Sequence, residues 1–588
     1  MPAEPQKPDA ASYRGHVDFF GFHAGAGGFV FGGWVGHAAA AAIPKADLVL
    51  GFESLDLNGR GTAAFYPRAG LGPRGVGMVL FVPAAGRPQG EFFSVTTREH
   101  GGRLAVTPTV QTRECDAAEL AALLAPLLAE AAPPLPPALC AALLGGPTAP
   151  RPGFTGANTL DQLSDRVLLE VDRTIVCPPD GLALIGWLLA APGVVAALRL
   201  HGGQGVQVLD PARFVRVPRP GVIEAVGRDL GFDDVRCGFI AFAAIGVASY
   251  LEVETAAGEI GYRPLPAPQG HGMAAIQSLL EGCDLQFAEV ATAFDDVLGP
   301  AIRGLAAARL AAPPVVARVD FGTLPEAPRA SVVVPLYRRL DYIEPQLAFM
   351  AHDPGMAGVE LLYVLDEPKR RREAENLCES LFARLAVPFT LLVLDRNLGF
   401  APASNAGLAA ARGATVCFLN SDAFPLDGGW LDALAARLAD DPALGIVAPL
   451  LLHEDGTVQH QGMGFRRLPR YGNWFFSYHE RLGLQPQGSG LHPARAVTGA
   501  CIVMRSDQAR ALGGFDEAYV IGDFEDSDLC LRAHAAGLGC AVDFDVRLCH
   551  LGRRSQASTD ERWRMNLVLY NAWLHHTRWA ATLAGAAG

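Results

Sequence analysis

The pattern of hydrophobic and polar positions changes about halfway along the chain. Before residue 311, short apolar segments are separated by turns rich in glycine and proline, and residues 91–97 and 249–255 alternate polar with apolar positions. This pattern predicts short β-strands in sandwich-like sheets. After residue 330, apolar segments of strand length alternate with stretches of helical spacing. That alternation is typical of an α/β domain built on a mostly parallel sheet.

The β-rich part of the chain contains the same pattern twice. In each copy an aspartate precedes a glycine-bearing apolar segment that ends at a tryptophan, and a further apolar segment and a helical zone follow. The matching segments of the first and second copy are Asp18 to Trp34 and Asp172 to Trp187, 75–82 and 237–243, and the helical zones 117–130 and 273–310. Such repetition predicts two β-rich units of one type, each with a helical appendix. We interpret both tryptophans as core aromatics, with a sugar-stacking platform as the alternative.

Composition suggests where the domains end. A segment rich in proline and alanine follows the second helical zone and is typical of a linker. We therefore predict a multidomain chain with a first β-rich unit at 1–150, a second at 151–312, a linker at 313–329 and an α/β domain at 330–588.

One apolar run has nearly the length of a membrane span. It covers residues 181–198, but Gly186, Pro192 and Gly193 interrupt it. We predict a strand, a turn and a second strand there.

Charge and cysteine content exclude several classes of function. The formal net charge is −13, and no stretch interleaves dense Lys and Arg with aromatics, so we expect no nucleic acid partner. Eleven cysteines without a C-x-x-C spacing argue against a zinc ribbon or a disulfide framework and are typical of the cytoplasm. No apolar segment follows a basic start, so no secretion signal is expected. Residues 563–583 predict a packing helix, with peripheral contact to the inner face of a membrane as the alternative.

Polar residues follow the apolar strands of the α/β domain. The first strand ends at Pro335, just before Tyr337, and the next two end at Asp366 and Asp395. In open α/β sheets, ligands bind beyond the carboxyl ends of the strands. A turn with Asn397 and Gly399 then opens a helix that contains Asn405, and the strand 415–419 stops at Asn420, Ser421 and Asp422.

This ordered set of motifs resembles the nucleotide-sugar-binding half of the inverting glycosyltransferases of family 2, which have the GT-A fold. The most similar members are the rhamnosyltransferase-like enzymes that build bacterial surface polysaccharides. The resemblance implies donor contacts from Pro335, Tyr337, Asp366, Asn397, Gly399, Asn405, Asn420, Ser421 and Gly499. It also implies that Asp422 is a ligand of Mg²⁺ or Mn²⁺. The family's first carboxylate is replaced by Asn420, whose amide forms hydrogen bonds but carries no charge.

Acidic residues gather in a second motif at 522–532, after the predicted strand that begins near Gly499. The resemblance implies that Asp526 is the general base, with Asp528 as the second choice and Glu525 beside them. The alternative is a helix start that is stabilised by an ion pair between Asp528 and Arg532, which lie four residues apart.

A third motif follows the last strand. His550 stands where the family has a histidine metal ligand, and Arg553 and Arg554 come shortly afterwards. The two arginines either bind the diphosphate or are exposed charges. The aromatic and Arg-rich segment 465–494 is either a lid over the acceptor or a surface that packs against the neighbouring domain.

These motifs predict a metal-dependent hexosyltransferase that uses a UDP- or dTDP-sugar and inverts the anomeric centre. Its acceptor would be a hydroxyl of a glycan or glycoconjugate. A non-catalytic carbohydrate-binding or scaffold protein is the alternative, and Asn420 is the residue that favours it. A nucleotidyltransferase would need a Gly-rich loop after the first strand, and residues 336–339 contain no glycine. The β-rich half could recognise the acceptor, form a homo-oligomer or act as a spacer.

Overall fold

The computed structural model describes most of the chain, in two compact units. The described residues are 11–12, 15–37, 40, 47–52, 56–68, 71, 75–87, 92–97, 102–103, 112–129, 135, 137–143, 154–203, 205–228, 231–552 and 562–585. The first unit comprises Met1–Asp165, Pro192–Ala196 and Glu252–Tyr262. The second comprises Arg166–Ala191, Ala197–Leu251 and Arg263–Gly588.

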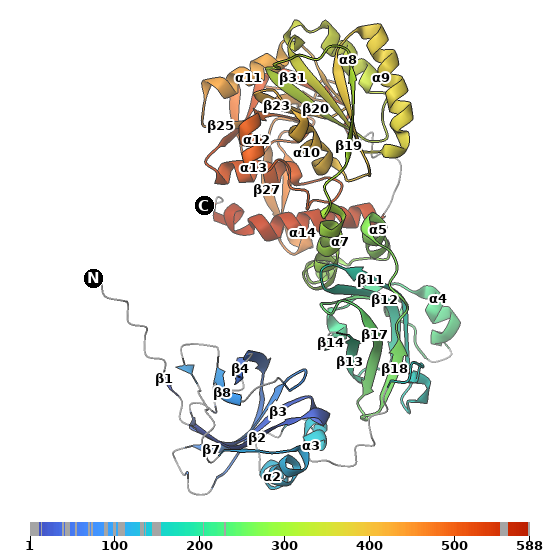
Figure 1. Cartoon of the computed structure of the whole chain (residues 1–588), viewed down its shortest axis with the longest axis vertical. Helices are drawn as coiled ribbons and strands as arrows, with labels where there is room; N and C mark the ends of the chain where they lie inside the picture. The colour runs from blue at the N-terminus through green and yellow to red at the C-terminus, as the bar shows by residue number, and fades with distance from the viewer. Residues whose placement is uncertain are drawn as a thin grey trace, which may run out of the picture. The chain divides into compact units, whose positions relative to one another are not determined.

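The first unit is a two-layered β-structure with helices (Figure 1). One sheet has the order β10 (Arg113–Glu114), β2 (Gly15–His23), β3 (Gly28–Val35), β7 (Val76–Pro83) and β6 (Thr62–Tyr66). The other has the order β5 (Asp56–Arg60), β4 (Asp47–Phe52) and β8 (Phe92–Thr97). Leu48 and Leu50 of the smaller sheet pack against one face of the larger sheet. Leucines of α2 (Ala117–Ala129) and α3 (Pro137–Leu143) pack against the other face. The expected β-rich character is therefore confirmed.

The second β-rich region contains two four-stranded sheets. One has the order β11 (Val167–Cys177), β12 (Gly181–Ala190), β16 (Gly238–Ala243) and β15 (Val215–Val217). The other has the order β14 (Gly205–Leu209), β13 (Val195–Gly202), β17 (Ala248–Thr255) and β18 (Ile260–Pro264). The apolar run 181–198 thus forms β12, a turn and the start of β13, as the interrupting residues predict. Helices α5 (Gly272–Glu281), α6 (Val290–Ala293) and α7 (Gly299–Leu310) follow.

The first hairpins of the two β-rich regions share an irregularity. The pairing of β2 with β3 shifts between Val17 and Phe19, and that of β11 with β12 shifts between Val171 and Arg173. The aspartate at each bulge forms an ion pair, Asp18 with Arg68 and Asp172 with Arg219. Each opposing glycine lacks space for a side chain, because a Cβ on Gly33 or Gly186 would lie 2.1 Å from a backbone oxygen. The tryptophans of β3 and β12 are half-buried.

The α/β domain contains a mixed sheet of eleven strands (Figure 1). Its main order is β19 (Val316–Phe321), β22 (Phe389–Leu394), β21 (Val359–Leu365), β20 (Ala330–Leu336), β23 (Thr415–Leu419), β30 (Cys501–Arg505), β25 (Leu444–Leu452), β31 (Gly539–His550) and β24 (Ala423–Pro425). Strand β26 (Val458–His460) pairs with β25, and β29 (Leu491–Ala494) pairs with β31.

Two expectations about this sheet are wrong. Only β22, β21, β20 and β23 form a continuous parallel block; β30 and β24 run antiparallel to their neighbours. These directions depend on pairing between segments far apart in the chain, such as Leu419 opposite Cys501, which local patterns do not show. The segment predicted as a linker also contains a strand, β19, which pairs antiparallel with β22. In β19, Ala317 and Val319 pack on the core while Arg318 and Asp320 alternate with them.

Helices cover both faces of the sheet. Residues of α8 (Ile343–His352), α9 (Arg371–Leu385) and α11 (Trp430–Asp440) share one core with Val332 and Val334. Residues of α10 (Phe400–Ala410), α12 (Ser506–Ala511) and α13 (Glu525–Ala535) share the other core with Val333. Successive side chains of β20 therefore enter opposite layers, as the strand period requires.

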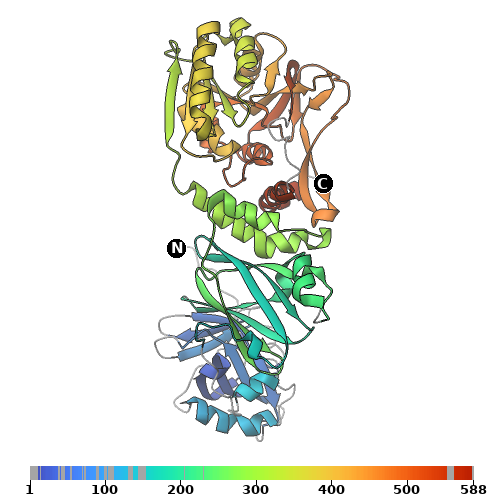
Figure 2. The same cartoon turned by 90° about the vertical axis from the view of Figure 1, so that its right-hand side faces the viewer.

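The helical zone before the α/β domain shares a core with the last helix, α14 (Arg562–Gly585). Figure 2 views α14, in red, close to its axis, with the green helices α5 and α7 beside it. Asn566 Nδ2 of α14 donates to the backbone oxygen of Leu280 over 2.9 Å, and Trp573 Nε1 donates to Asp295 over 2.7 Å. The prediction of a packing helix at 563–583 is therefore confirmed. None of the described helices has the length and apolar character that crossing a membrane requires.

The aromatic segment 465–494 packs against the same core. It contains a hairpin of β27 (Met463–Leu468) and β28 (Trp474–His479). Trp474 is buried, and its ring lies edge-on to Phe294 with the centroids 5.8 Å apart. Of the two interpretations of this segment, the structure thus shows packing against the neighbouring helical zone.

Candidate active site

The parallel strands of the α/β domain bring most of the predicted donor-binding residues to one edge of the sheet. Strands β20, β21 and β23 are adjacent and parallel, so their carboxyl ends meet. Pro335 is the penultimate residue of β20, and Tyr337 follows that strand. Asp366 follows β21, and Asn420 follows β23. This edge is where α/β sheets bind their ligands.

Asp366 fixes the turn that enters α10. Its buried carboxylate accepts hydrogen bonds from the backbone N–H groups of Leu398 and Gly399, each over 2.7 Å. Asn397 Nδ2 donates to the Asp366 carbonyl over 2.8 Å. Burial raises the pKa of Asp366 to about 7, although the two N–H groups oppose the shift. The predicted donor-binding residues Asp366, Asn397 and Gly399 therefore form one hydrogen-bonded group.

Gly399 allows a close contact between this turn and the acidic motif. Its φ is 100°, a region that favours glycine. A Cβ at this position would lie 2.9 Å from the Cα of Ile521. The next residue, Phe400, donates its N–H to the Ile521 carbonyl over 2.8 Å. The turn after Asp366 and the segment that leads to Asp526 are thus joined directly.

Asn405 has a different position from the one predicted. Its Nδ2 donates to the Phe515 carbonyl and to Glu517 Oε1, both over 2.8 Å, and its Oδ1 accepts from the Phe515 N–H over 2.9 Å. These bonds use both ends of the amide within the chain. Asn405 therefore holds the segment around Phe515 and does not present a free amide to a donor.

Asp422 and His550 lie together, as the resemblance implies. Strand β24 pairs with β31 so that Ala423 is opposite His550, which brings the end of β31 to the Asn420–Ser421–Asp422 turn. The buried Asp422 Oδ1 lies 3.2 Å from His550 Nε2, and Asn420 Nδ2 lies 3.4 Å from the same nitrogen. Ser421, which stands between Asn420 and Asp422 in the sequence, is half-buried.

Gln459 of β26 orients the histidine and was missed from the sequence. Its Oε1 lies 2.5 Å from His550 Nδ1, and its Nε2 donates to the His550 carbonyl over 2.7 Å. An amide oxygen only accepts, so Nδ1 is the donor of this bond, and Nε2 is the ring nitrogen that faces Asp422. The sequence signal that could have indicated such a role is the pair Gln459 and His460, which follows the polar turn 453–457 after the apolar segment 444–452.

This pair fits a divalent cation. A carboxylate oxygen and an imidazole lone pair face each other across 3.2 Å, and a positive ion between them would satisfy both. Among the residues that the structure describes, no group of three His, Cys, Asp or Glu side chains could hold a metal ion. Two protein ligands would leave coordination positions for donor phosphate oxygens and water.

Asp526 lies at the start of α13, and the segment Gly499–Ala500 connects it with Asn420. Its Oδ2 accepts from the Gly499 N–H over 3.0 Å, and its Oδ1 accepts from the Ser527 N–H over 2.6 Å. The residue after Gly499, Ala500, accepts the Asn420 N–H over 2.9 Å. Burial raises the pKa of Asp526, and the N–H groups of Gly499 and Ser527 act in the opposite direction. A raised pKa near a polar edge is a property of general bases.

The turn before Asp526 has an unusual backbone. Ile521, Asp523 and Phe524 have φ values of 67°, 81° and 74°, in the region that non-glycine residues rarely adopt. Such conformations cost free energy and concentrate at functional sites. The buried Glu525 follows, and its Oε2 has no hydrogen-bond partner among the described residues. Burial, and then the charge of Asp526, raise the pKa of Glu525.

Asp528 has a structural position that rules out its second-choice role as base. Its Oδ1 accepts from Arg578 over 2.6 Å, from Trp579 over 2.9 Å and from Tyr519 over 3.2 Å, and its Oδ2 accepts from Arg532 over 2.7 Å. Burial alone would raise the pKa of Asp528, but the charges of Arg532 and Arg578 hold it below its ordinary value. The carboxylate therefore ties α13 to α14. The predicted arginines Arg553 and Arg554 lie outside the described residues.

One known family matches the first part of the α/β domain. Residues 331–498 match the family model of Glycosyl transferase family 2. The C-terminal part of this chain contains a family 2 glycosyltransferase domain. The matched range ends just before Gly499, so it includes the Asp366 and Asp422 motifs but not Asp526 or His550.

Relatives extend the similarity. The O-antigen biosynthesis protein RfbC of Myxococcus xanthus is 28% identical over 437 residues, which cover 72% of this chain and 32% of RfbC. The pre-mycofactocin glycosyltransferase of Mycobacterium tuberculosis (strain ATCC 25618 / H37Rv) is 37% identical over 142 residues, which cover 24% of this chain and 27% of that protein. The chain thus spans at most about a third of the length of these relatives.

Solved structures show weaker similarity. GalNAc-T7 with UDP, GalNAc and Mn²⁺ has a TM-score of 0.31 and 14% identity, covering 38% of this chain and 44% of that one. The mannosyltransferase PcManGT of Pyrobaculum calidifontis with GDP-Man and Mn²⁺ has a TM-score of 0.28 and 19% identity, covering 53% and 85%. These scores are low, and the assignment of the domain rests on the family model.

Proposed function

We propose that this chain transfers a sugar from a nucleotide diphosphate sugar to a hydroxyl of a glycan or glycoconjugate, with inversion. The observation that carries the proposal is the link between Asp526 and the strand-end turn. Asp526 bonds to Gly499, and the next peptide bonds to Asn420, which precedes the Asp422 and His550 pair. Two backbone hydrogen bonds thus connect the candidate base with the turn that carries the candidate site for the donor phosphates.

The chemistry follows from these groups. Asp526 would take the proton of the acceptor hydroxyl while the hydroxyl oxygen attacks the anomeric carbon. The bond between the anomeric carbon and the diphosphate oxygen would break on the opposite face of the sugar, and the nucleoside diphosphate would leave. A single displacement with one base and no protein nucleophile inverts the anomeric configuration. Mg²⁺ or Mn²⁺ bound at Asp422 and His550 would supply positive charge beside the diphosphate. Asn420 would contribute a hydrogen bond to the donor but no charge.

Asp366 supports the assignment of a donor site. Its carboxylate holds the Asn397 to Gly399 turn at the edge where α/β sheets bind nucleotides. We therefore assign the nucleoside of a UDP- or dTDP-type donor to this side, near Pro335 and Tyr337. The name of RfbC supports a role in bacterial surface polysaccharide or glycoconjugate synthesis.

The β-rich regions are proposed to be two copies of one unit. The matching bulges, the ion pairs of Asp18 and Asp172, and the crowded glycines Gly33 and Gly186 support this. The proposed units comprise residues 1–150 and 151–312. A cytoplasmic location is also proposed, and it is supported by the free state of all eleven cysteines.

Asn420 favours a second candidate, a carbohydrate-binding scaffold without catalysis. Its Nδ2 lies 3.4 Å from His550 Nε2, where it could satisfy the ring nitrogen in place of a metal. The transferase would turn over a nucleotide-sugar donor, whereas the scaffold would not.

The test is incubation of the purified full chain with UDP-, dTDP- and GDP-sugars plus Mn²⁺. We expect slow hydrolysis of at least one donor, because water can replace the acceptor. The Asp422→Ala variant should lose this activity, whereas Asp427→Ala, which removes an exposed aspartate just after β24, should retain it. If no donor is bound or hydrolysed by the unaltered chain, the scaffold is the better description.

A further inference from the structure

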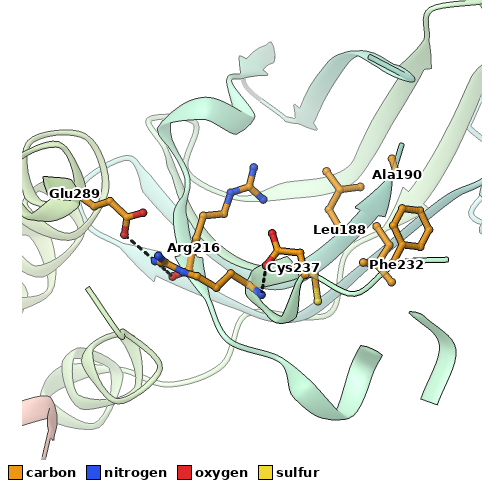
Figure 3. Close-up of a pocket in the computed structure, with 9 residues that line it drawn as sticks. Leu188, Ala190, Arg216, Phe232, Cys237 and Glu289 are labelled. Atoms are coloured by element: carbon orange, nitrogen blue, oxygen red, sulfur yellow. Dashed lines mark hydrogen bonds and ion pairs between the residues drawn. The ribbon is translucent and has the colours of Figure 1, made fainter. Parts of the chain in front are cut away.

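The second β-rich region contains a pocket that the proposed transfer chemistry does not use. Its volume is about 410 Å³, within the range of small-molecule sites. Leu188, Ala190 and Phe232 line one side (Figure 3). Arg216 and Glu289 lie on the opposite side in the same view. An apolar wall therefore faces a polar one.

The polar wall contains two guanidinium groups, Arg216 and Arg236. Arg236 Nη2 donates to Glu289 Oε2 over 2.7 Å and to the Arg216 carbonyl over 3.3 Å. Its Nε is buried and has no hydrogen-bond partner among the described residues. Arg216 Nη2 donates to the Pro211 carbonyl over 3.1 Å. Because the Arg236 Nε is shielded from solvent, the guanidinium that a ligand in the pocket can reach is that of the half-buried Arg216.

The charges of the wall favour a neutral ligand. Two guanidinium groups, Arg216 and Arg236, are matched by two carboxylates, Asp234 and Glu289. A phosphate or carboxylate ligand would meet these acidic groups, whereas neighbouring hydroxyls can both donate to a carboxylate and accept from a guanidinium. The apolar wall suits the C–H face of a sugar ring, which packs on aromatic and aliphatic side chains.

Comparison of the two copies shows that the arginines are not needed to build the fold. Gly77 is opposite Trp34 in the first copy, and Gly238 is opposite Trp187 in the second. With these pairs aligned, the strand registers place Phe65 at the position of Arg216. The residue two positions before Gly77 is Gly75, and the residue two positions before Gly238 is Arg236. The bulge ion pairs are common to both copies, but the cationic wall belongs to the second copy.

We propose that this pocket binds one neutral sugar unit of the acceptor glycan. Phe232 stacks on the ring, and Arg216 with Asp234 contacts its hydroxyls. The site would hold the acceptor chain at a distance from the bond that forms at Asp526. The assignment of the sugar to an acceptor rests on the proposed function, but sugar binding by the pocket does not.

The test is saturation-transfer difference NMR on the full chain. The probes are the methyl glycosides of mannose, rhamnose, galactose and glucose, with inorganic phosphate (by ³¹P line broadening) and glucuronate as anionic probes. At least one neutral glycoside should bind, and Phe232→Ala and Arg216→Ala should each weaken that binding about tenfold. Arg384→Ala, which removes an exposed arginine of α9, is the matched control and should bind as the unaltered chain does.

Thermal unfolding shows whether each variant is folded. If Phe232→Ala unfolds, the half-buried Arg216 still provides the test. Binding of the anionic probes alone would overturn the proposal, as would the absence of binding by any probe or equal binding by both variants. Donor hydrolysis measured on the same samples should be unchanged in both variants. Glycoside binding without any donor hydrolysis would contradict the proposed transfer while leaving the pocket assignment intact.

Discussion

The role of Gln459 leads to a quantitative prediction about metal affinity. The substitution Gln459→Leu keeps a similar volume but removes both hydrogen bonds to His550, one to the ring and one to the backbone carbonyl. Without the first bond, the ring loses the contact that holds its Nδ1 and thereby orients Nε2 toward Asp422. We therefore expect the variant to bind Mn²⁺ more weakly while its fold is retained.

The size of the effect follows from the two lost contacts. Each hydrogen bond contributes about 1 kcal/mol of net stability. Loss of a group that orients a metal-bound histidine lowers metal affinity about 10- to 100-fold. That loss corresponds to ~1.4–2.7 kcal/mol of binding free energy.

Electron paramagnetic resonance of free Mn²⁺ measures this affinity without turnover. Gln487→Leu is the matched control, because Gln487 is exposed and its side chain accepts a hydrogen bond from Arg481. Equal Mn²⁺ affinity in Gln459→Leu and the unaltered chain would refute the positioning role. No Mn²⁺ binding by the unaltered chain would refute the metal assignment itself.

Three further predictions concern the acidic motif and its neighbouring turn. Asp528→Asn should lower the unfolding free energy at neutral pH by about 3 kcal/mol, because Arg532 and Arg578 lose a buried partner. The depressed pKa of Asp528 means that this loss shrinks as pH falls, and chemical denaturation against pH checks it with Asp507→Asn as control. Because the pKa of Asp526 is raised, the transfer rate should begin to fall at a higher pH than the pKa of an ordinary aspartate as the solution is acidified. A transfer rate that stays constant down to that ordinary pKa would contradict this. Gly399→Ala should destabilise the chain by about 1–3 kcal/mol more than Gly456→Ala, since both glycines have positive φ but only Gly399 faces a backbone within 2.9 Å; equal thermal shifts would contradict that account.

The sequence indicated the strand-end site because its residues obey local rules. Asp366, Asn420 and Asp422 each follow an apolar strand, and parallel strands end at a common edge. His550 could be placed for the same reason, at the end of a long strand. The bond between Asp526 and Gly499 was not visible in any local pattern, but both residues stand in motifs whose order resembles that of the family.

The errors concern contacts between distant parts of the chain. The partners Arg578 and Trp579 of Asp528 lie in α14, so the nearby Arg532 was the only partner that spacing could indicate. Gln459 meets His550 across 91 residues. Strand β19 was hidden in a segment rich in proline and alanine, because its pairing with β22 is a tertiary interaction that outweighs local composition.

The central claim is that Asp526 removes the acceptor proton during sugar transfer. Its most direct test compares Asp526→Asn with the unaltered chain, using the donor that the panel identifies. The rate of sugar release or transfer should fall about 10²- to 10⁴-fold. Donor affinity measured by calorimetry should stay nearly unchanged, because the amide retains the shape of the carboxylate. A variant that transfers sugar at the rate of the unaltered chain would contradict the account.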